Sequence, residues 1–90
     1  MKRAIFPGTF DPFTLGHLDI LNRCKLIFED VIIGIGKNDE KTSMFSIEKR
    51  IELIKSVINK DDKIQVMSYD GLTIDFCKKV NADFIVRGIR

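Results

Sequence analysis

The sequence predicts an α/β fold in which helices wind around both faces of a parallel sheet. Three observations favour this class. Short apolar runs alternate with longer segments whose apolar residues recur at the 3.6-residue period of a helix. The run 31–36 reads Val-Ile-Ile-Gly-Ile-Gly, which is typical of a strand covered on both faces. Strands that alternate with amphipathic helices form right-handed βαβ units, and such units build a parallel sheet.

The first half of the chain contains two strands and two helices. A strand is expected over 3–6, where Pro7 and Gly8 stop it. A helix follows over about 15–28, with Thr14 as its N-cap. The second strand covers about 31–35 and leads into a polar loop, 36–43. Ser46 then caps a second helix, whose apolar stripe is Ile47, Ile51, Ile54 and Ile58.

The second half completes the order βαβαβαβ. A third strand is expected over 64–67 and a fourth over 82–86. The helix between them carries an apolar stripe made of Leu72, Phe76, Cys77 and Val80. In doubly wound sheets, ligands bind beyond the carboxyl ends of the strands. This rule selects four loops as candidate binding segments: 7–16, 36–45, 68–72 and 87–90.

Composition excludes several classes of protein. The 90 residues are 44% hydrophobic and 31% charged, with two Pro and six Gly, which excludes a disordered or low-complexity chain. The net charge of +2 comes from interspersed charges with no basic stripe, and this argues against a nucleic-acid partner. The longest apolar run is far shorter than a membrane span, so no membrane partner is expected.

The two cysteines have neither the spacing of a zinc site nor that of a disulfide framework. Cys24 and Cys77 lie in different predicted helices. We therefore interpret them as two small core thiols in a reducing, cytoplasmic compartment.

The loop after the first strand has the properties of a phosphate-binding segment. It joins a strand to a helix whose first turn holds Gly16 and His17. The amide groups and the positive end of the helix dipole suit an anion there. Gly8 allows a tight turn, and Gly16 lets a ligand approach the backbone closely. A different interpretation is that His17 packs against the apolar residues that follow it on the same helix face, but its place in this loop favours the binding role.

Other residues in these loops have ordinary interpretations. Asp11 could bind a metal or orient its loop, and an Asp before a proline favours the turn. Lys37 is interpreted as a solvated charge. Gly34 and Gly36 hint at a dinucleotide-binding fingerprint, but Asp39 replaces its third glycine and a polar loop follows.

Three motifs resemble one known family. Residues 7–17, Pro-Gly-Thr-Phe-Asp-Pro-Phe-Thr-Leu-Gly-His, resemble the (His/Thr)-x-Gly-His signature of the nucleotidyltransferase superfamily. In detail, the chain is similar to the phosphopantetheine adenylyltransferases: the signature begins with Thr14, Lys41 stands three residues before Met44, and residues 87–90 read Arg-Gly-Ile-Arg. The resemblance covers the whole chain, and its motifs occur in the expected loops.

The resemblance implies a Rossmann-like nucleotidyltransferase fold and a reaction. In that reaction, the phosphate of 4′-phosphopantetheine attacks the α-phosphorus of ATP, giving dephospho-coenzyme A and pyrophosphate in coenzyme A biosynthesis. Because this nucleophile is already an anion, no strong general base is needed. The sequence offers no nucleophile–base pair near the loop, which agrees with direct transfer. Catalysis then means holding two anions in line and neutralising the charge that develops.

The resemblance also implies roles for individual residues. His17 and Lys41 are the expected catalytic residues: His17 hydrogen-bonds the α-phosphate, and Lys41 binds the attacking phosphate. Thr9 helps to place the phosphates of both substrates. The further expected ATP-binding residues are Phe10, Gly16 and Arg90, and the further substrate-binding residues are Leu72, Thr73 and Arg87. Mg²⁺ is expected with ATP, and no protein side chain is assigned to it.

The resembled family continues beyond its Arg-Gly-(Leu/Ile)-Arg motif with a fifth strand and a segment that closes over ATP. We therefore expect residues 1–90 to be the N-terminal portion of a single nucleotidyltransferase domain. The family also implies a homo-oligomer, a hexamer, in the cytoplasm. Two alternatives stay open. One is a non-catalytic α/β module that binds phosphate. The other is a nucleotidyltransferase with another acceptor, such as nicotinamide mononucleotide. Thr14 and the motif at 87–90 argue against this second alternative.

Overall fold

The structure is a computed structural model that describes residues 2–37, 44–58 and 61–87. Its elements alternate between strand and helix. In chain order they are β1 (Arg3–Gly8), α1 (Leu15–Cys24), β2 (Asp30–Gly36), α2 (Ile47–Ile58), β3 (Ile64–Tyr69), α3 (Thr73–Lys79) and β4 (Phe84–Ile85). All neighbouring strands pair in parallel, in the order β3-β2-β1-β4. The predicted fold class and element order are therefore confirmed.

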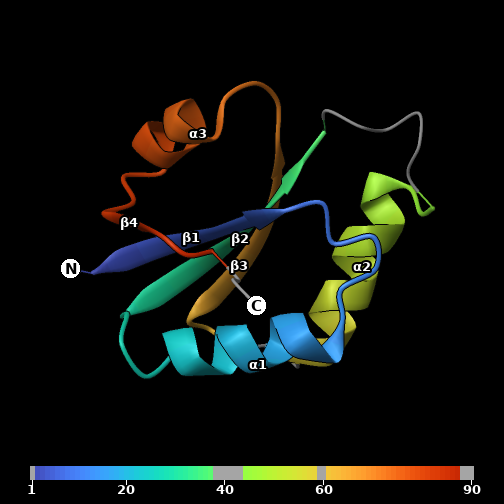
Figure 1. Ribbon diagram of the computed structural model, residues 1–90, viewed down its shortest axis with the longest axis horizontal. Helices are drawn as coiled ribbons and strands as arrows, with labels where there is room; N and C mark the ends of the chain where they lie inside the picture. Colours follow the sequence, from blue (N-terminus) through green and yellow to red (C-terminus); the bar gives the residue numbers. More distant parts are fainter. Residues whose placement is uncertain (1, 38–43, 59–60, 88–90) are drawn as a thin grey trace.

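The sheet lies between two layers of helices. Figure 1 shows α3 on the opposite side of the sheet from α1 and α2. One core cluster joins Phe6 of β1 to Leu21 of α1 and Ile54 of α2. The other joins Ile5, the neighbouring residue of β1, to Phe76 of α3. Successive strand residues thus enter opposite cores, as the two-residue period of a strand requires, and the sheet is wound on both faces.

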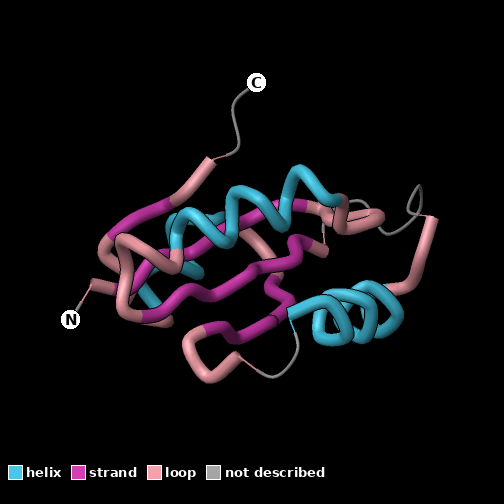
Figure 2. Tube along the Cα trace, turned by 90° about the horizontal axis from the view of Figure 1, so that it is seen from below, coloured by secondary structure: helices cyan, strands magenta, loops and turns pink. Residues whose placement is uncertain are grey.

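The strand order reverses at β1. The chain passes from β1 outward to β2 and β3, and β4 then returns to pair on the other side of β1. Seen from below in Figure 2, α1 lies over the strands, with β3 and β4 at opposite edges of the sheet. The segments that leave the carboxyl ends of β1 and β4 therefore emerge side by side. This is the topological switch point, where doubly wound folds bind their ligands.

Several expected boundaries differ from the structure by a few residues, among them two at strands and two at helices. β1 continues through Pro7 to Gly8, and Pro7 pairs with Gly34 of β2. A proline is tolerated there because β4 pairs with β1 only at Ala4 and Ile5, so the strand has one neighbour at this point. β4 spans Phe84–Ile85 rather than 82–86.

The other two differences concern helices. α1 ends at Cys24 instead of 28, because the amides of Leu26 and Ile27 bond to carbonyls three rather than four positions earlier, those of Arg23 and Cys24. Leu72 is the N-cap of α3 and is 66% exposed, so it does not belong to the buried stripe of that helix. Ala82 was expected in the fourth strand, but it lies before β4. Its amide donates a hydrogen bond to the Cys77 carbonyl at the end of α3.

Gly34 leaves no space for a side chain. A Cβ there would lie 2.8 Å from Phe76 Cε2 and 3.1 Å from Tyr69 Cε1. These two rings stack with centroids 4.3 Å apart and nearly parallel planes. We expect Gly34→Ala to lower the free energy of unfolding by about 1–3 kcal/mol through overpacking, measured by urea denaturation. Gly36→Ala is the matched control, since among the described residues its Cβ would meet nothing nearer than Tyr69 Oη at 3.6 Å. Equal stability of the two variants would contradict this account.

Asp61 connects the segment before β3 to the end of α1. Its carboxylate forms an ion pair with Lys25 and accepts a hydrogen bond from the Lys63 amide at 3.0 Å. The hydrogen-bonded Lys25, followed by the Lys63 amide, holds the pKa of Asp61 below its usual value of 3.8. A lowered pKa in the folded state contributes stability that is present above 3.8 and is lost as the pH falls through the folded-state pKa.

We therefore expect Asp61→Asn to flatten the acid side of the stability profile. The measurement is the free energy of unfolding from neutral pH down to below the usual pKa of an aspartate. Asp62→Asn, at the exposed neighbouring position, should keep the slope of the parent protein. If the Asp61 and Asp62 variants lose stability in parallel on acidification, the ion pair with Lys25 contributes nothing.

Candidate functional site

The segment 9–14 joins the end of β1 to the start of α1 and turns sharply at Phe10. Phe10 has a φ of 50°, in the left-handed region, and its ring is buried. The ring packs edge-on against Phe6 and contacts Phe13. A Cβ at Gly8 would lie only 3.0 Å from the Phe10 ring, so this close approach requires a glycine there. Burial of the Phe10 ring thus anchors a polar loop to the core.

His17 and Thr14 form a reciprocal cap at the start of α1. The Thr14 hydroxyl accepts a hydrogen bond from the His17 amide at 3.3 Å, and His17 Nδ1 accepts one from the Thr14 amide at 2.9 Å. Because a backbone amide can only donate, Nδ1 must be the accepting nitrogen. In the neutral imidazole the proton is therefore on Nε2, and that nitrogen is the donor of the ring.

Three phenylalanine rings surround the imidazole. The His17 ring lies 5.0 Å from the Phe10 ring at 81°, 5.4 Å from the Phe13 ring and 6.2 Å from the Phe6 ring, all between centroids. Together with the cap, these contacts set the orientation of a side chain that is only partly buried. The sequence-based role for His17 requires such a fixed orientation, because a donor for one phosphate oxygen must point in one direction.

The first turn of α1 also supplies backbone donors. Four amides at a helix start have no partner within the helix. The reciprocal cap satisfies two of them, those of Thr14 and His17. The other two belong to Leu15 and Gly16, at the positive end of the helix dipole, where they can bind an anion. Next to them lies a hollow of about 200 Å³, lined by Phe6, Pro7, Gly8, Phe10, Gly16, His17 and Ile20.

The same loop is tied to the segment that begins α2. The Asp11 carboxylate accepts hydrogen bonds from the amides of Met44 and Phe45, the latter at 2.8 Å. Asp11 therefore orients its loop through the backbone of the next loop. Lys41 lies outside the described residues, but it is only three positions before Met44 in the sequence. The Thr9 side chain is exposed beside this junction.

Arg87, Leu72 and Thr73 lie along the same edge of the sheet. Arg87 is exposed and follows the end of β4 by two residues. The residue before it, Val86, donates its amide to the Ile5 carbonyl at 2.8 Å. Arg87 therefore emerges beside the end of β1. Leu72 and Thr73 begin α3, after β3, two strands away from β1. Arg90 lies outside the described residues.

The loop before α3 is held by Tyr69, whose hydroxyl lies 2.9 Å from the Thr73 hydroxyl. This loop borders a hollow of about 330 Å³ whose lining includes Lys37 and Asp70. Lys37 pairs with Asp70 at 3.7 Å, in agreement with its interpretation as a surface charge.

Sequence reasoning missed Arg50. Its side chain is only 3% exposed, and its Nη1 donates to the Thr9 carbonyl at 2.9 Å. A signal was present in the sequence: Arg50 follows Ile47 by three positions and precedes Ile54 by four, so it lies on the apolar stripe of α2.

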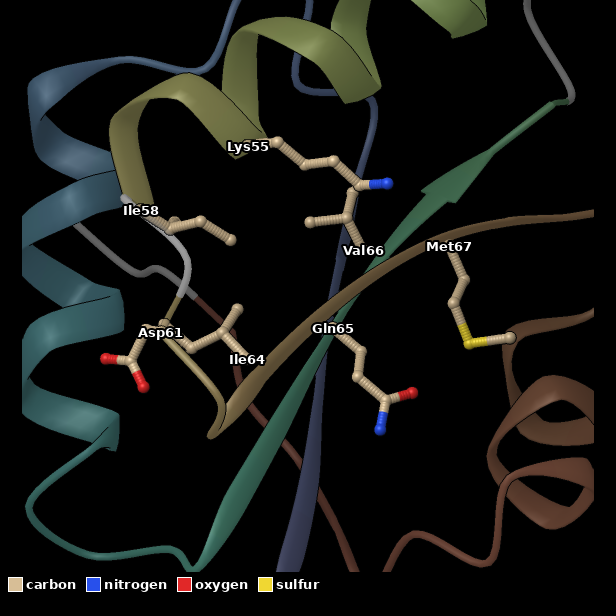
Figure 3. Close-up of a pocket in the computed structure, with 7 residues that line it drawn as sticks. All are labelled: Lys55, Ile58, Asp61, Ile64, Gln65, Val66 and Met67. Atoms are coloured by element: carbon tan, nitrogen blue, oxygen red, sulfur yellow. The ribbon is translucent and has the colours of Figure 1, made fainter.

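Another hollow lies away from these loops. Figure 3 shows it between α2 and the edge strand β3, with Lys55 and Ile58 coming from the helix and 64–67 from the strand. Its volume is about 400 Å³. It runs along β3 rather than beyond the carboxyl ends of the strands, and so it does not lie where doubly wound folds bind ligands.

Within 2–37, 44–58 and 61–87, no group of three or more His, Cys, Asp or Glu side chains gathers in a way that could hold a metal ion. None of the helices described is both long and apolar enough to cross a membrane.

Comparison with known proteins agrees with the fold and with the family that the motifs resemble. The chain matches the cytidylyltransferase-like family over residues 5–90, and it belongs to that family. It is 54% identical over 90 residues to a phosphopantetheine adenylyltransferase of Bacteroides fragilis, a match that covers 100% of this chain and 60% of that protein. It is 49% identical over 87 residues to the phosphopantetheine adenylyltransferase of Leptospira biflexa, covering 97% of this chain and 54% of that protein. The resemblance indicated by the motifs is therefore confirmed, over a chain that spans less than two thirds of these relatives.

A solved structure confirms the fold. A bifunctional NMN adenylyltransferase/ADP ribose pyrophosphatase from Francisella tularensis superposes with a TM-score of 0.79 at 24% identity, covering 99% of this chain and 32% of that one. Such a likeness shows the architecture alone. The predicted Rossmann-like nucleotidyltransferase fold is thus the observed one.

The reciprocal cap leads to a prediction on stability. Thr14→Ala removes the hydroxyl that accepts from the His17 amide, and we expect it to lower the free energy of unfolding by about 1 kcal/mol. Thr14→Ser retains a hydroxyl at the N-cap, so its free energy of unfolding should differ from that of the parent by only about a few tenths of a kcal/mol. Urea denaturation of both variants measures the difference. If the alanine and serine variants are equally stable, the Thr14 hydroxyl does not cap α1.

Proposed function

We propose that the protein containing this chain transfers the adenylyl group of ATP to 4′-phosphopantetheine, releasing pyrophosphate and forming dephospho-coenzyme A. The observation that carries the proposal is the start of α1, where an oriented imidazole and the backbone of Gly16 line one hollow. Support also comes from the relatives, which are named for this activity and are identical to the chain at about half of the aligned positions.

In this mechanism the chain binds and orients two anions. The attacking phosphate is already ionised, so no residue has to remove a proton from it. His17 donates from Nε2 to an oxygen of the α-phosphate, because Nδ1 is already the acceptor of the Thr14 amide. This donor becomes more effective as negative charge grows on the phosphorus oxygens, and it therefore stabilises the transition state more than the ground state.

The other residues divide between the two substrates. Lys41 binds the attacking phosphate and neutralises charge during transfer, and Arg87 holds the same phosphate from the end of β4. Thr9, Phe10 and Gly16 form the wall on the side of the ATP phosphates.

Further residues act at the two ends of the site. Arg90 reaches the phosphates of the nucleotide. Leu72, whose side chain is exposed, and its neighbour Thr73 face the pantetheine arm.

Magnesium enters this reaction as part of the nucleotide. The Asp11 carboxylate, the one acidic side chain in 9–14, already accepts two backbone hydrogen bonds. We therefore assign the ion to the phosphates of ATP, with no protein carboxylate as its resident ligand. When bound there, Mg²⁺ neutralises phosphate charge and favours the departure of pyrophosphate.

The proposal includes a cytoplasmic homo-oligomer, a hexamer as in the resembled family, with ATP and 4′-phosphopantetheine as its ligands. The state of the cysteines supports a reducing compartment. Cys24 and Cys77 are free, buried and in cores on opposite faces of the sheet. Burial raises the pKa of the Cys24 thiol above 9.0, so that it stays protonated and packs as a small apolar group. Sedimentation of the full-length protein tests the oligomeric state.

Replacement of His17 tests the function. In the protein at its full natural length, we expect His17→Ala to lower kcat for adenylyl transfer by roughly 10²–10³-fold, since one donor to the developing charge is lost. Pyrophosphate release with ATP and 4′-phosphopantetheine is the measurement.

The controls separate the role of His17 from a loss of structure. Asn22→Ala, an exposed change on the same helix, should leave kcat unchanged, and the circular dichroism spectra of both variants should match the parent. A near-normal kcat for His17→Ala removes His17 from the mechanism. A parent protein that releases pyrophosphate only with nicotinamide mononucleotide, or with neither acceptor, refutes the proposed activity.

A further inference from the structure

Arg50 is a charged side chain at a position suited to an apolar one. It is the one polar or charged residue that is buried among the residues described, and it shares a face of α2 with Ile47 and Ile54. Moving a guanidinium out of water is costly unless its hydrogen bonds are replaced. An apolar residue would fill this position without that cost. The contacts of the guanidinium therefore indicate what Arg50 does.

Those contacts join the start of α2 to the loop after β1. Nη1 donates to the Thr9 carbonyl at 2.9 Å, and Nε donates to the Ser46 carbonyl at 3.4 Å. The planar guanidinium thereby links the loop after β1 to the residue that precedes α2. Thr9 immediately precedes Phe10, the residue with the left-handed backbone.

These hydrogen bonds of Arg50 form one brace on the loop, and a second brace acts on the other side of Phe10. Asp11 accepts hydrogen bonds from Met44 and Phe45, two residues just before α2. Phe10 is thus bracketed by residues that are both tied to the segment 44–50. A left-handed φ costs a residue other than glycine about 1–2 kcal/mol, and such a conformation persists only where the surroundings enforce it. Here the braces and the burial of the Phe10 ring enforce it.

The backbone conformation of Phe10 determines where its ring lies. That ring is the nearest aromatic neighbour of His17, 5.0 Å away and almost perpendicular to it. A relaxation of the turn at Phe10 would withdraw this ring and allow the imidazole to change its orientation. The chain of contacts therefore runs from Arg50 through Thr9 and Phe10 to His17.

We propose that Arg50 is a positioning residue: by holding the Thr9 carbonyl, its buried guanidinium keeps Phe10 in the left-handed conformation that orients the His17 imidazole. Arg50 acts through other residues and contacts neither substrate. Its effect on catalysis rests on the proposed adenylyl transfer, whereas its effect on the His17 ring does not.

The kinetic test is a double-mutant cycle in the full-length protein. A displacement of about 1 Å at a reacting group can cost roughly 10²-fold in rate, so we expect Arg50→Met to lower kcat by about that factor while KM for ATP changes far less. If Arg50 acts through His17, then His17→Ala should cost less than about tenfold in the Arg50→Met background, because coupled residues are not additive. Arg50→Lys, which can restore one donor to Thr9, should recover most of the activity.

The second test needs no activity. His17 is the one histidine in these 90 residues, and its ring protons lie among phenylalanine rings. Their NMR signals, assigned by comparison with His17→Ala, should move toward those of a free imidazole in Arg50→Met and stay near the parent values in Arg50→Lys. Lys55→Met, an exposed change on the same helix, should leave both kcat and these signals unchanged. Arg50→Gln, which keeps a donor for the Ser46 carbonyl, replaces Arg50→Met if the latter does not fold.

The outcomes distinguish this inference from the proposed function. Unchanged His17 signals in Arg50→Met overturn the inference even if the parent protein is active. The inference is also overturned if kcat of Arg50→Met equals that of an active parent, or if the effects of Arg50→Met and His17→Ala on kcat are additive. If the parent protein does not transfer adenylyl groups but the His17 signals move as expected, the proposed function fails and the structural link from Arg50 to His17 stands.

Discussion

The site depends on a turn that the chain makes immediately after its central strand. Phe10 adopts a backbone conformation that is unfavourable for its residue type, and in return its ring enters the core between Phe6 and His17. Burying a phenylalanine side chain is worth about 1.5–3 kcal/mol, which is sufficient to offset the backbone cost. A polar loop is thereby anchored by an apolar residue, and the loop can present its backbone without being mobile.

The charges of the site follow from the same turn. The start of α1 offers the positive end of a helix dipole, and the reciprocal cap between Thr14 and His17 leaves the imidazole with a defined donor nitrogen. Arg50 places a permanent positive charge beneath the loop, where water does not screen it. The described part of the site thus consists of donors and positive charge, which suits two phosphorylated ligands. The acidic residue nearest to it, Asp11, is occupied by backbone amides.

Most of the fold could be predicted from the sequence, because periodicity and β-branched runs report local structure directly. Element boundaries were predicted less well, for reasons that lie outside each element. Pro7 could remain in β1 because the neighbouring β4 is short, and Leu72 left the buried stripe because α3 begins one residue later. Thr9, Phe10, Gly16 and His17 were found from one motif, since they are contiguous or nearly so. Arg50 was not, because its partner Thr9 lies in another loop and no local pattern reveals such a contact.

The sequence by itself determined the alternation of strands and helices, the family resemblance and the identity of the residues at the start of α1. These are properties of short segments, in which neighbouring residues decide the outcome. Only the tertiary structure decided which nitrogen of His17 donates, what Asp11 binds and why a core position of α2 carries an arginine. Each of these depends on a hydrogen bond whose partner is set by the fold, and a buried polar group is stable only when that partner is in place.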